Sequence, residues 1–313
     1  MVTPNSRRAF LFGRRTASTP WGQFCTRLSR TCEGALSWND DPAHPQAWLR
    51  PARAPDVLHA HALCREYGVR LGLEGVGAAP RSAHPVLWVE PGSAWATLKP
   101  QDAAGTQWRA DAGCTIGALQ AAGIQAVAGV DPHWSVARWL ASEQSARWLT
   151  GEGGHSGIEQ VQVLLADGTT EVLGPFGASA QKPLASLTTQ QMVPRLFELS
   201  GSASAAVCLR AAKWPARFRL DALMPVPGTE VNLAWLMAGH AGCLAWVESV
   251  WLNRIVAPAS PASPDPGGSE DLQVMLSAAD VIDWQVKQTF DPYGFFLPFL
   301  HSKGLESASP KPD

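Results

Sequence analysis

The sequence predicts an α+β fold, and three stretches carry this prediction. Residues 46–73 contain a short strand, a helix and a second strand, a unit of the kind that makes a parallel sheet. Residues 158–173 hold two β-rich runs joined at Asp167-Gly168, which is typical of an antiparallel hairpin. Residues 189–201 and 277–290 follow with helical spacing of their apolar side chains.

The first helix has recognisable ends. Pro55 suits the first helical position, Asp56 favours the positive end of the helix dipole, and Gly68 suits the exit. The apolar face expected from the helical spacing consists of Val57, Ala60, Cys64 and Tyr67. The preceding strand stops at Pro51.

Further elements follow along the chain. Residues 86–90 and 106–113 read as strands, and residues 115–123 as a short helix that Thr115 is able to cap. Pro194 is expected to interrupt the later helical stretch. Residues 205–214 are predicted to form a strand that ends before a proline.

Composition narrows the class of protein. The chain has 313 residues, enough for one large domain or two smaller ones, and a net charge of −2 that gives no basis for binding nucleic acid. No stretch approaches the roughly 18 apolar residues of a membrane span. No two of the six cysteines are separated by only two residues, so we predict free thiols, no metal site and a cytoplasmic protein.

Both ends of the chain look irregular. Residues 1–45 are expected to form a basic arm, which is either a solvated tail or a segment that docks a partner. Its stretch SRRAFL resembles a twin-arginine export signal, but Arg14 and Arg15 interrupt the apolar run that such a signal needs. Residues 256–271 are rich in Pro, Ser and Gly and predict an exposed linker.

The stretch RLGLEGVGAAP, residues 70–80, has the composition of a loop that lets backbone approach a phosphate. With the strand–helix–strand unit before it, the stretch resembles the opening of the FAD-linked oxidase family, which has a PCMH-type FAD-binding domain. In that family an Arg-Gly-Gly-Gly-Thr-Ser loop holds the FAD pyrophosphate with backbone N–H groups. The resemblance assigns this cofactor-binding role to Gly75, Val76, Gly77, Ala78 and Ala79.

The loop departs from the family pattern in three ways. One glycine and the hydroxyl pair are absent, and Glu74 adds a negative charge. A carboxylate about 4–6 Å from a phosphate would repel it by about 1 kcal/mol in water and by several at an effective dielectric near 20. Ala78 and Ala79 offer no nucleophile, so the resemblance implies non-covalent FAD.

Later segments keep the family order. DPHWSVARWLAS resembles a second loop that lines flavin and phosphates; Ser135 and Val136 match it, and Arg138 replaces a glycine with a positive charge. SGIEQVQVLLADGTTEVLG resembles the family hairpin, in which Ile158 would place its backbone against adenine or flavin. The stretch 196–217 resembles a glycine-rich segment of the family. The C-terminal stretch VKQTFDPYGFFLPF resembles the closing motif at Lys287, Phe290, Asp291, Pro292, Gly294 and Pro298.

The resemblance divides the chain into parts. Residues 46–222 match the PCMH-type FAD-binding domain, with two α/β subdomains, and residues 223–313 would be a strongly shortened cap region with the linker, a C-terminal helix and a tail. This short form looks most like the FAD-binding subunit of bacterial glycolate oxidase, which works beside a second flavoprotein subunit and an iron–sulfur subunit.

Three hypotheses follow. The first is an FAD-binding oxidoreductase subunit that passes electrons from a 2-hydroxy acid, its small-molecule substrate, to flavin. The second is a non-catalytic assembly or regulatory subunit that kept the fold and lost FAD. The third is an unrelated α/β protein. No catalytic residue is assigned, because His133 and His155 lie in stretches that read first as solvated loops.

Overall fold

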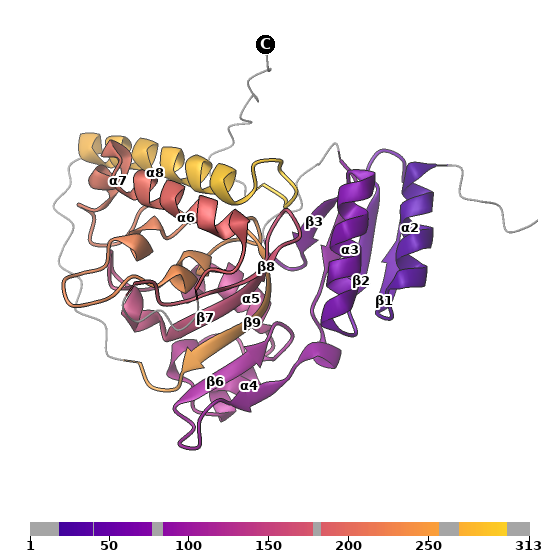
Figure 1. Cartoon of the computed structure of the whole chain (residues 1–313), viewed down its shortest axis with the longest axis horizontal. Helices are drawn as coiled ribbons and strands as arrows, with labels where there is room; N and C mark the ends of the chain where they lie inside the picture. The colour runs from indigo at the N-terminus through magenta and orange to yellow at the C-terminus, as the bar shows by residue number, and fades with distance from the viewer. Residues whose placement is uncertain (1–18, 40, 77–83, 178–182, 257–268, 299–313) are drawn as a thin grey trace, which may run out of the picture.

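Two sheets, each in its own lobe, make up the fold of this computed structural model, which describes residues 19–39, 41–76, 84–177, 183–256 and 269–298. Figure 1 shows the N-terminal lobe at the right and the larger lobe at the left, with α8 along the top of the latter. Both sheets are flanked by helices, so the predicted α+β class is confirmed.

The first lobe has a four-stranded sheet in the order β1-β2-β4-β3. Strands β2, β4 and β3 pair in parallel, as predicted from the strand–helix–strand unit, and β1 pairs with β2 antiparallel. Its elements are α2 (Pro20–Thr31), β1 (Ala35–Trp38), β2 (Gln46–Arg50), α3 (Ala54–Tyr67), β3 (Arg70–Leu73) and β4 (Val86–Val89).

The helix α3 ends where the sequence predicts, and its start carries an additional contact. Gly68 adopts the left-handed conformation with φ 66°, which a glycine reaches without steric cost. The buried carboxylate of Asp56 accepts backbone N–H bonds from Glu33, Gly34 and Ala52 at 2.9–3.1 Å. Asp56 therefore ties the start of α3 to the chain that leaves α2.

The expectation of an irregular arm up to residue 45 is wrong for residues 20–38. Thr19 caps α2 by accepting from the Gly22 N–H, and Pro20 occupies its first turn. Phe24 and Leu28 are fully buried, and the Phe24 ring lies 5.9 Å from that of Tyr67 on α3. The arm residues 1–18 lie outside the described part of the chain.

The second lobe has a five-stranded antiparallel sheet in the order β5-β6-β9-β7-β8. The strands are β5 (Leu98–Pro100), β6 (Gln107–Asp111), β7 (Ile158–Leu164), β8 (Thr170–Leu173) and β9 (Trp246–Asn253). The α-helices are α4 (Ile116–Ala121), α5 (Val136–Ala141), α6 (Leu187–Ser200), α7 (Ala203–Cys208) and α8 (Ser269–Phe290). The 3₁₀ helices are η1 (Ser93–Trp95), η2 (Gln125–Val127), η3 (Glu143–Ser145), η4 (Gly153–Ser156), η5 (Leu220–Leu223) and η6 (Leu233–Met237).

The predicted hairpin is present, and its turn residue Gly168 has a φ of 91°. The middle strand of the sheet, β9, was not expected. It lies between β6 and β7, so residues 246–253 complete the sheet of the body predicted to end at residue 222. The predicted boundary at residue 222 therefore does not separate two structural units.

Two local predictions are wrong. Residues 203–208 form the helix α7 and not a strand, because Ser202 caps the run by accepting from the Ala205 N–H and alanine favours helix. The helix α6 also continues through Pro194, so the expected interruption does not occur.

The C-terminal segment joins the two lobes. After α8, the chain runs along the free edge of β3, where the Leu71 N–H donates to the Phe295 carbonyl (3.1 Å) and the Leu297 N–H donates to the Leu71 carbonyl (3.2 Å). The buried Lys287 ammonium donates to Asp291 (2.5 Å) and to the Cys243 carbonyl (2.7 Å). The matched closing motif is thus a structural latch between the lobes.

A second contact links the lobes at the far end of α3. The His61 ring contacts the Leu165 carbonyl at 3.0 Å through Nε2, and the Arg65 guanidinium donates to the Asp167 carbonyl. Burial lowers the pKa of His61 to about 4, so the ring is neutral near pH 7. The six cysteines carry thiols and form no disulfide with one another. Within the described residues, each helix is too short or too polar to cross a lipid bilayer.

Candidate functional site

The structure brings together the starts of the two loops that the resemblance singles out. Gly75 follows β3 with a φ of 76°, and a Cβ built on it would lie 3.6 Å from the guanidinium carbon of Arg138 at the start of α5. The Arg138 guanidinium also lies over the ring of Trp134, 4.4 Å from its centroid. A positive charge therefore stands beside the beginning of the first loop, while Gly77, Ala78 and Ala79 lie outside the described residues.

Glu74 does not face this positive charge. Its side chain is hydrogen-bonded to Trp48 and interacts with Glu90 and Arg50, which belong to the neighbouring strands β2 and β4 or follow them directly. Burial, followed by repulsion from Glu90, raises the pKa of the Glu74 carboxyl. The expected repulsion between Glu74 and an anion at the loop is therefore weakened by the direction of the side chain.

The start of α5 has no free amide to offer. Ser135 caps the helix by accepting from the Arg138 N–H at 3.2 Å. The Val136 N–H donates to the Cys114 carbonyl (2.8 Å), and the Ala137 N–H donates to the Ala112 carbonyl (3.0 Å). The first three amides of the helix, which a phosphate would otherwise meet, are thus bonded inside the protein.

Ile158 is similarly engaged. Its N–H donates to Ser156 Oγ at 3.0 Å, and its carbonyl accepts from Trp235 Nε1 at 2.8 Å. Ile158 lines an open groove of about 330 Å³ together with Trp235 and Asn232, and it does not line the cavity between the lobes. The backbone groups of Ile158 are therefore bonded to neighbouring side chains.

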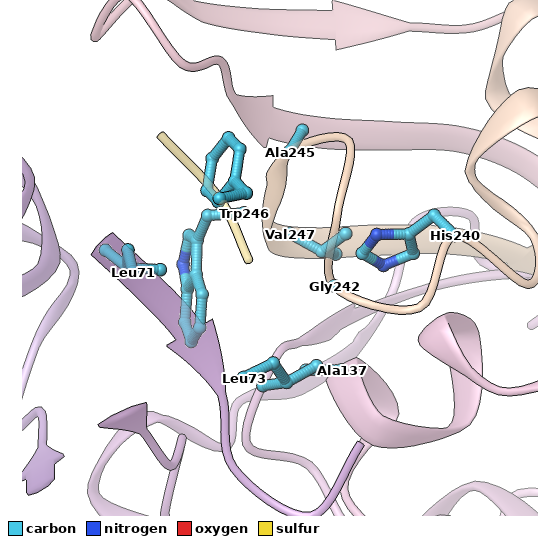
Figure 2. Close-up of a pocket in the computed structure, with 9 residues that line it drawn as sticks. Leu71, Leu73, Ala137, His240, Gly242, Ala245, Trp246 and Val247 are labelled. Atoms are coloured by element: carbon cyan, nitrogen blue, oxygen red, sulfur yellow. The ribbon is translucent and has the colours of Figure 1, made fainter. Parts of the chain in front are cut away.

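Figure 2 shows the residues that line a small cavity between the lobes. The cavity there measures about 10 Å³, which is about the room needed for one water molecule. Sites for drug-sized ligands and cofactors measure roughly 300–1,000 Å³. Its lining consists of Leu71, Leu73, Ala137, His240, Gly242, Ala245, Trp246, Val247 and Phe296.

Sequence reasoning missed the part of this lining that precedes and begins β9. Gly242 has a φ of 71°, and a Cβ built on it would lie 3.1 Å from Leu73 Cβ, so the backbone of one lobe lies directly against the other. Trp246 is 2% exposed and stacks on Trp95 with ring centroids 6.3 Å apart. The small-residue run AGHAG, residues 238–242, was the available signal, since it repeats the composition of the first loop.

His240 is the unusual polar group at this cavity. Figure 2 shows its ring beside Gly242 and Val247. Neither ring nitrogen has a hydrogen-bond partner among the described residues, and Trp246 Nε1 has none either. Burial, with a smaller contribution from Arg217, lowers the pKa of His240 to about 3. A neutral, fully buried imidazole with so low a pKa is a weak base near pH 7.

The two histidines considered from sequence do not reach the cavity. His133 is exposed in the loop before α5. His155 belongs to η4, and its Nε2 lies 3.8 Å from the carboxylate of Glu152. Neither residue lines the space between the lobes. Among the described residues no group of three or more His, Cys, Asp or Glu side chains is arranged to hold a metal ion.

The described residues do not fit FAD in this conformation. A pyrophosphate needs backbone donors, and those of Val136, Ala137 and Arg138 are already bonded. A flavin ring needs a slot, and the cavity lined by Leu73, Ala137 and Trp246 holds about one water. Only the positive charge of Arg138 beside Gly75 suits an anionic ligand.

Comparison with known proteins gives likenesses only among solved structures. No protein-family model and no curated protein matches the chain. The chain resembles the BBE-like 1 protein of Physcomitrella patens (15% identity, TM-score 0.42, 74% of this chain and 44% of that one). It also resembles 6-hydroxy-D-nicotine oxidase from Arthrobacter nicotinovorans (13%, 0.41, 71% and 42%) and 4-ethylphenol oxidase from Gulosibacter chungangensis (12%, 0.43, 78% and 44%).

The chain spans less than half the length of each of these structures. All three TM-scores are below 0.5, so the description of the fold rests on the strand order and pairing given above.

Proposed function

We propose that this chain is a subunit of a flavin-dependent oxidoreductase, built on the scaffold of the FAD-linked oxidases. The observation that carries the proposal is the meeting of the two matched loops, with Arg138 3.6 Å from the Cβ position of Gly75. The order of the matched segments in the sequence supports the same scaffold. The finer proposal, taken from the sequence resemblance, is a glycolate-oxidase-like complex that acts on a 2-hydroxy acid.

Within such a complex, the geometry favours the cofactor-free role. The amides at the start of α5 and the backbone of Ile158 are engaged, and the space between the lobes is filled by Leu73, Trp246 and their neighbours. In this role the chain would act as an assembly or regulatory subunit beside a second flavoprotein subunit and an iron–sulfur subunit. We expect this complex of subunits to form in the cytoplasm.

The FAD-carrying role is the second candidate, and the charge of Arg138 favours it. That side chain lies at the loop mouth over Trp134, while the carboxylate of Glu74 is held by Trp48 on the first sheet. In this role FAD, bound non-covalently, would supply the hydride-accepting chemistry. This chain would contribute the guanidinium as the counter-charge to a phosphate.

Co-expression of the chain with the products of its neighbouring genes tests the proposal. The purified complex is expected to contain this chain together with a flavoprotein subunit, and its visible spectrum is expected to show flavin. Subunit-resolved extraction then assigns the FAD to one chain. A chain that purifies alone and colourless from this co-expression would contradict the proposal.

A further inference from the structure

We infer that the packed seam between the lobes, and not the charge of Glu74, excludes FAD from this chain. The seam comprises Leu71 and Leu73 of β3, Ala137 of α5, the segment from His240 to Val247, and Phe296. This inference rests on the proposed function, since it concerns the same scaffold and decides between its two roles.

The closest contact of the seam is between Gly242 and β3. A Cβ on Gly242 would lie 3.1 Å from Leu73 Cβ and 3.8 Å from the Leu73 backbone nitrogen. The left-handed backbone of Gly242, followed by a buried Cys243 and Leu244, presses main chain against the strand that leads into the first loop. A ring inserted here would have to separate backbone from backbone.

The bulk of the seam is supplied by tryptophan. Trp246 belongs to the central strand β9 and is 2% exposed. Its ring stacks on that of Trp95, which lies in η1. Its Nε1 and both ring nitrogens of His240 lack partners among the described residues. Leaving buried polar atoms unpaired costs free energy, and that cost is tolerated here where close packing fills the space.

Hydrogen bonds connect the two lobes on both sides of the seam. On one side the Leu71 backbone pairs with Phe295 and Leu297, and Lys287 holds that segment through the Phe296 carbonyl at 3.3 Å. On the other side the ring of His61 contacts the Leu165 carbonyl. Opening the seam therefore requires hydrogen bonds to break as well as apolar surface to separate.

The charge of Glu74 is a weaker obstacle than the sequence implies. Its carboxylate is hydrogen-bonded to Trp48 and interacts with Glu90 and Arg50, while Arg138 lies against Gly75. Removing the Glu74 charge would therefore leave the seam unchanged. This separates the two explanations for FAD exclusion and makes them testable with different variants.

The first test is FAD binding by the purified full-length chain, measured by equilibrium dialysis and by flavin fluorescence. The wild-type chain and Glu74→Gln are both expected to take up no FAD. Stoichiometric uptake by the wild type would overturn the inference. Uptake by Glu74→Gln alone would overturn it too, because the loop would then be the obstacle.

The second test probes the seam itself with indole. Trp246→Ala removes a fully buried ring and is expected to gain a saturable upward shift in Tm with added indole, which refills the space. Trp284→Ala removes a ring that is 59% exposed on α8 and serves as the matched control, with no shift expected. Trp246→Val, which places a β-branched side chain in the strand, is the second variant should the alanine variant not fold.

A Trp246 variant that folds without any response to indole would show that this side chain does not fill the seam, and would overturn the inference. The outcomes also separate the inference from the proposed function. A wild-type chain that binds FAD contradicts the inference but leaves a FAD-carrying subunit. A chain that binds no FAD and joins no flavoprotein complex contradicts the proposed function but leaves the inference standing.

Discussion

Replacing Lys287 by methionine removes the charge from the latch between the lobes while keeping much of the side-chain length. Asp291 is fully buried, and it retains backbone N–H bonds from Phe295 and Phe296 at 2.8 Å each. Removing one partner of a buried ion pair costs about 3–5 kcal/mol, because the other charge is left without compensation. The two retained bonds place the expected loss of unfolding free energy for Lys287→Met near the lower end, at about 3 kcal/mol.

Urea denaturation of four proteins measures this effect: wild type, Lys287→Met, Asp291→Asn and the double variant. The double variant removes both charges, so its loss is expected to be smaller than the sum of the two single losses. A Lys287→Met variant within about 0.5 kcal/mol of wild type, the range of ordinary surface substitutions, would refute the latch. Strict additivity of the two single losses would refute the coupling between the residues.

The remaining predictions concern the seam and the pH dependence. Gly242→Ala is expected to lower Tm more than Gly105→Ala, because both glycines have positive φ but only at Gly242 does a Cβ meet another lobe, at 3.1 Å; equal losses in a thermal scan would contradict this. The pKa of His61 is lowered to about 4 from about 6.5, so the unfolded chain binds the extra proton and stability falls as pH drops from about 6.5 toward 4, by up to about 1.4 kcal/mol per pH unit. His61→Gln is expected to flatten that slope in denaturation curves. Burial raises the pKa of Asp283 to about 7, so this group makes stability fall as pH rises between about pH 4 and 7, in the opposite direction. An unchanged slope in His61→Gln would mean that His61 does not contribute.

Local signals accounted for what the sequence predicted correctly. Gly68 ends α3 and Gly168 forms the hairpin turn because both positions need a left-handed backbone that glycine adopts easily. The parallel direction of β2 and β3 follows from α3, which connects them, and both strands pair with β4. These features are set by neighbours in sequence, so their residues alone identify them.

Long-range pairing accounts for what was missed. Strand β9 pairs with β6 and β7, whose residues are more than eighty positions away, and its near-continuous burial gives no alternation to read. The strand expected at residues 205–214 failed because the Ser202 cap and the alanine run favour helix α7.

The candidate site was predictable only in part. Gly75 and Arg138 were candidates from the family order, and the structure places the Cβ position of Gly75 3.6 Å from the guanidinium carbon of Arg138. Ser135, Val136 and Ile158 were candidates too, but the sequence did not reveal that Cys114, Ser156 and Trp235 occupy their backbone groups or those of their neighbours. Such bonds depend on the tertiary structure. The direction of the Glu74 side chain depends on Trp48 in the same way.

The most direct test of the central claim is the FAD stoichiometry of this chain after it is purified within its complex and separated from its partners under native conditions. The claim that the seam excludes the cofactor predicts a colourless chain that binds no added FAD, with the flavin retained by the partner subunit. One equivalent of FAD on this chain would contradict it, and would assign the flavin chemistry of the complex to the loop at Gly75 and Arg138.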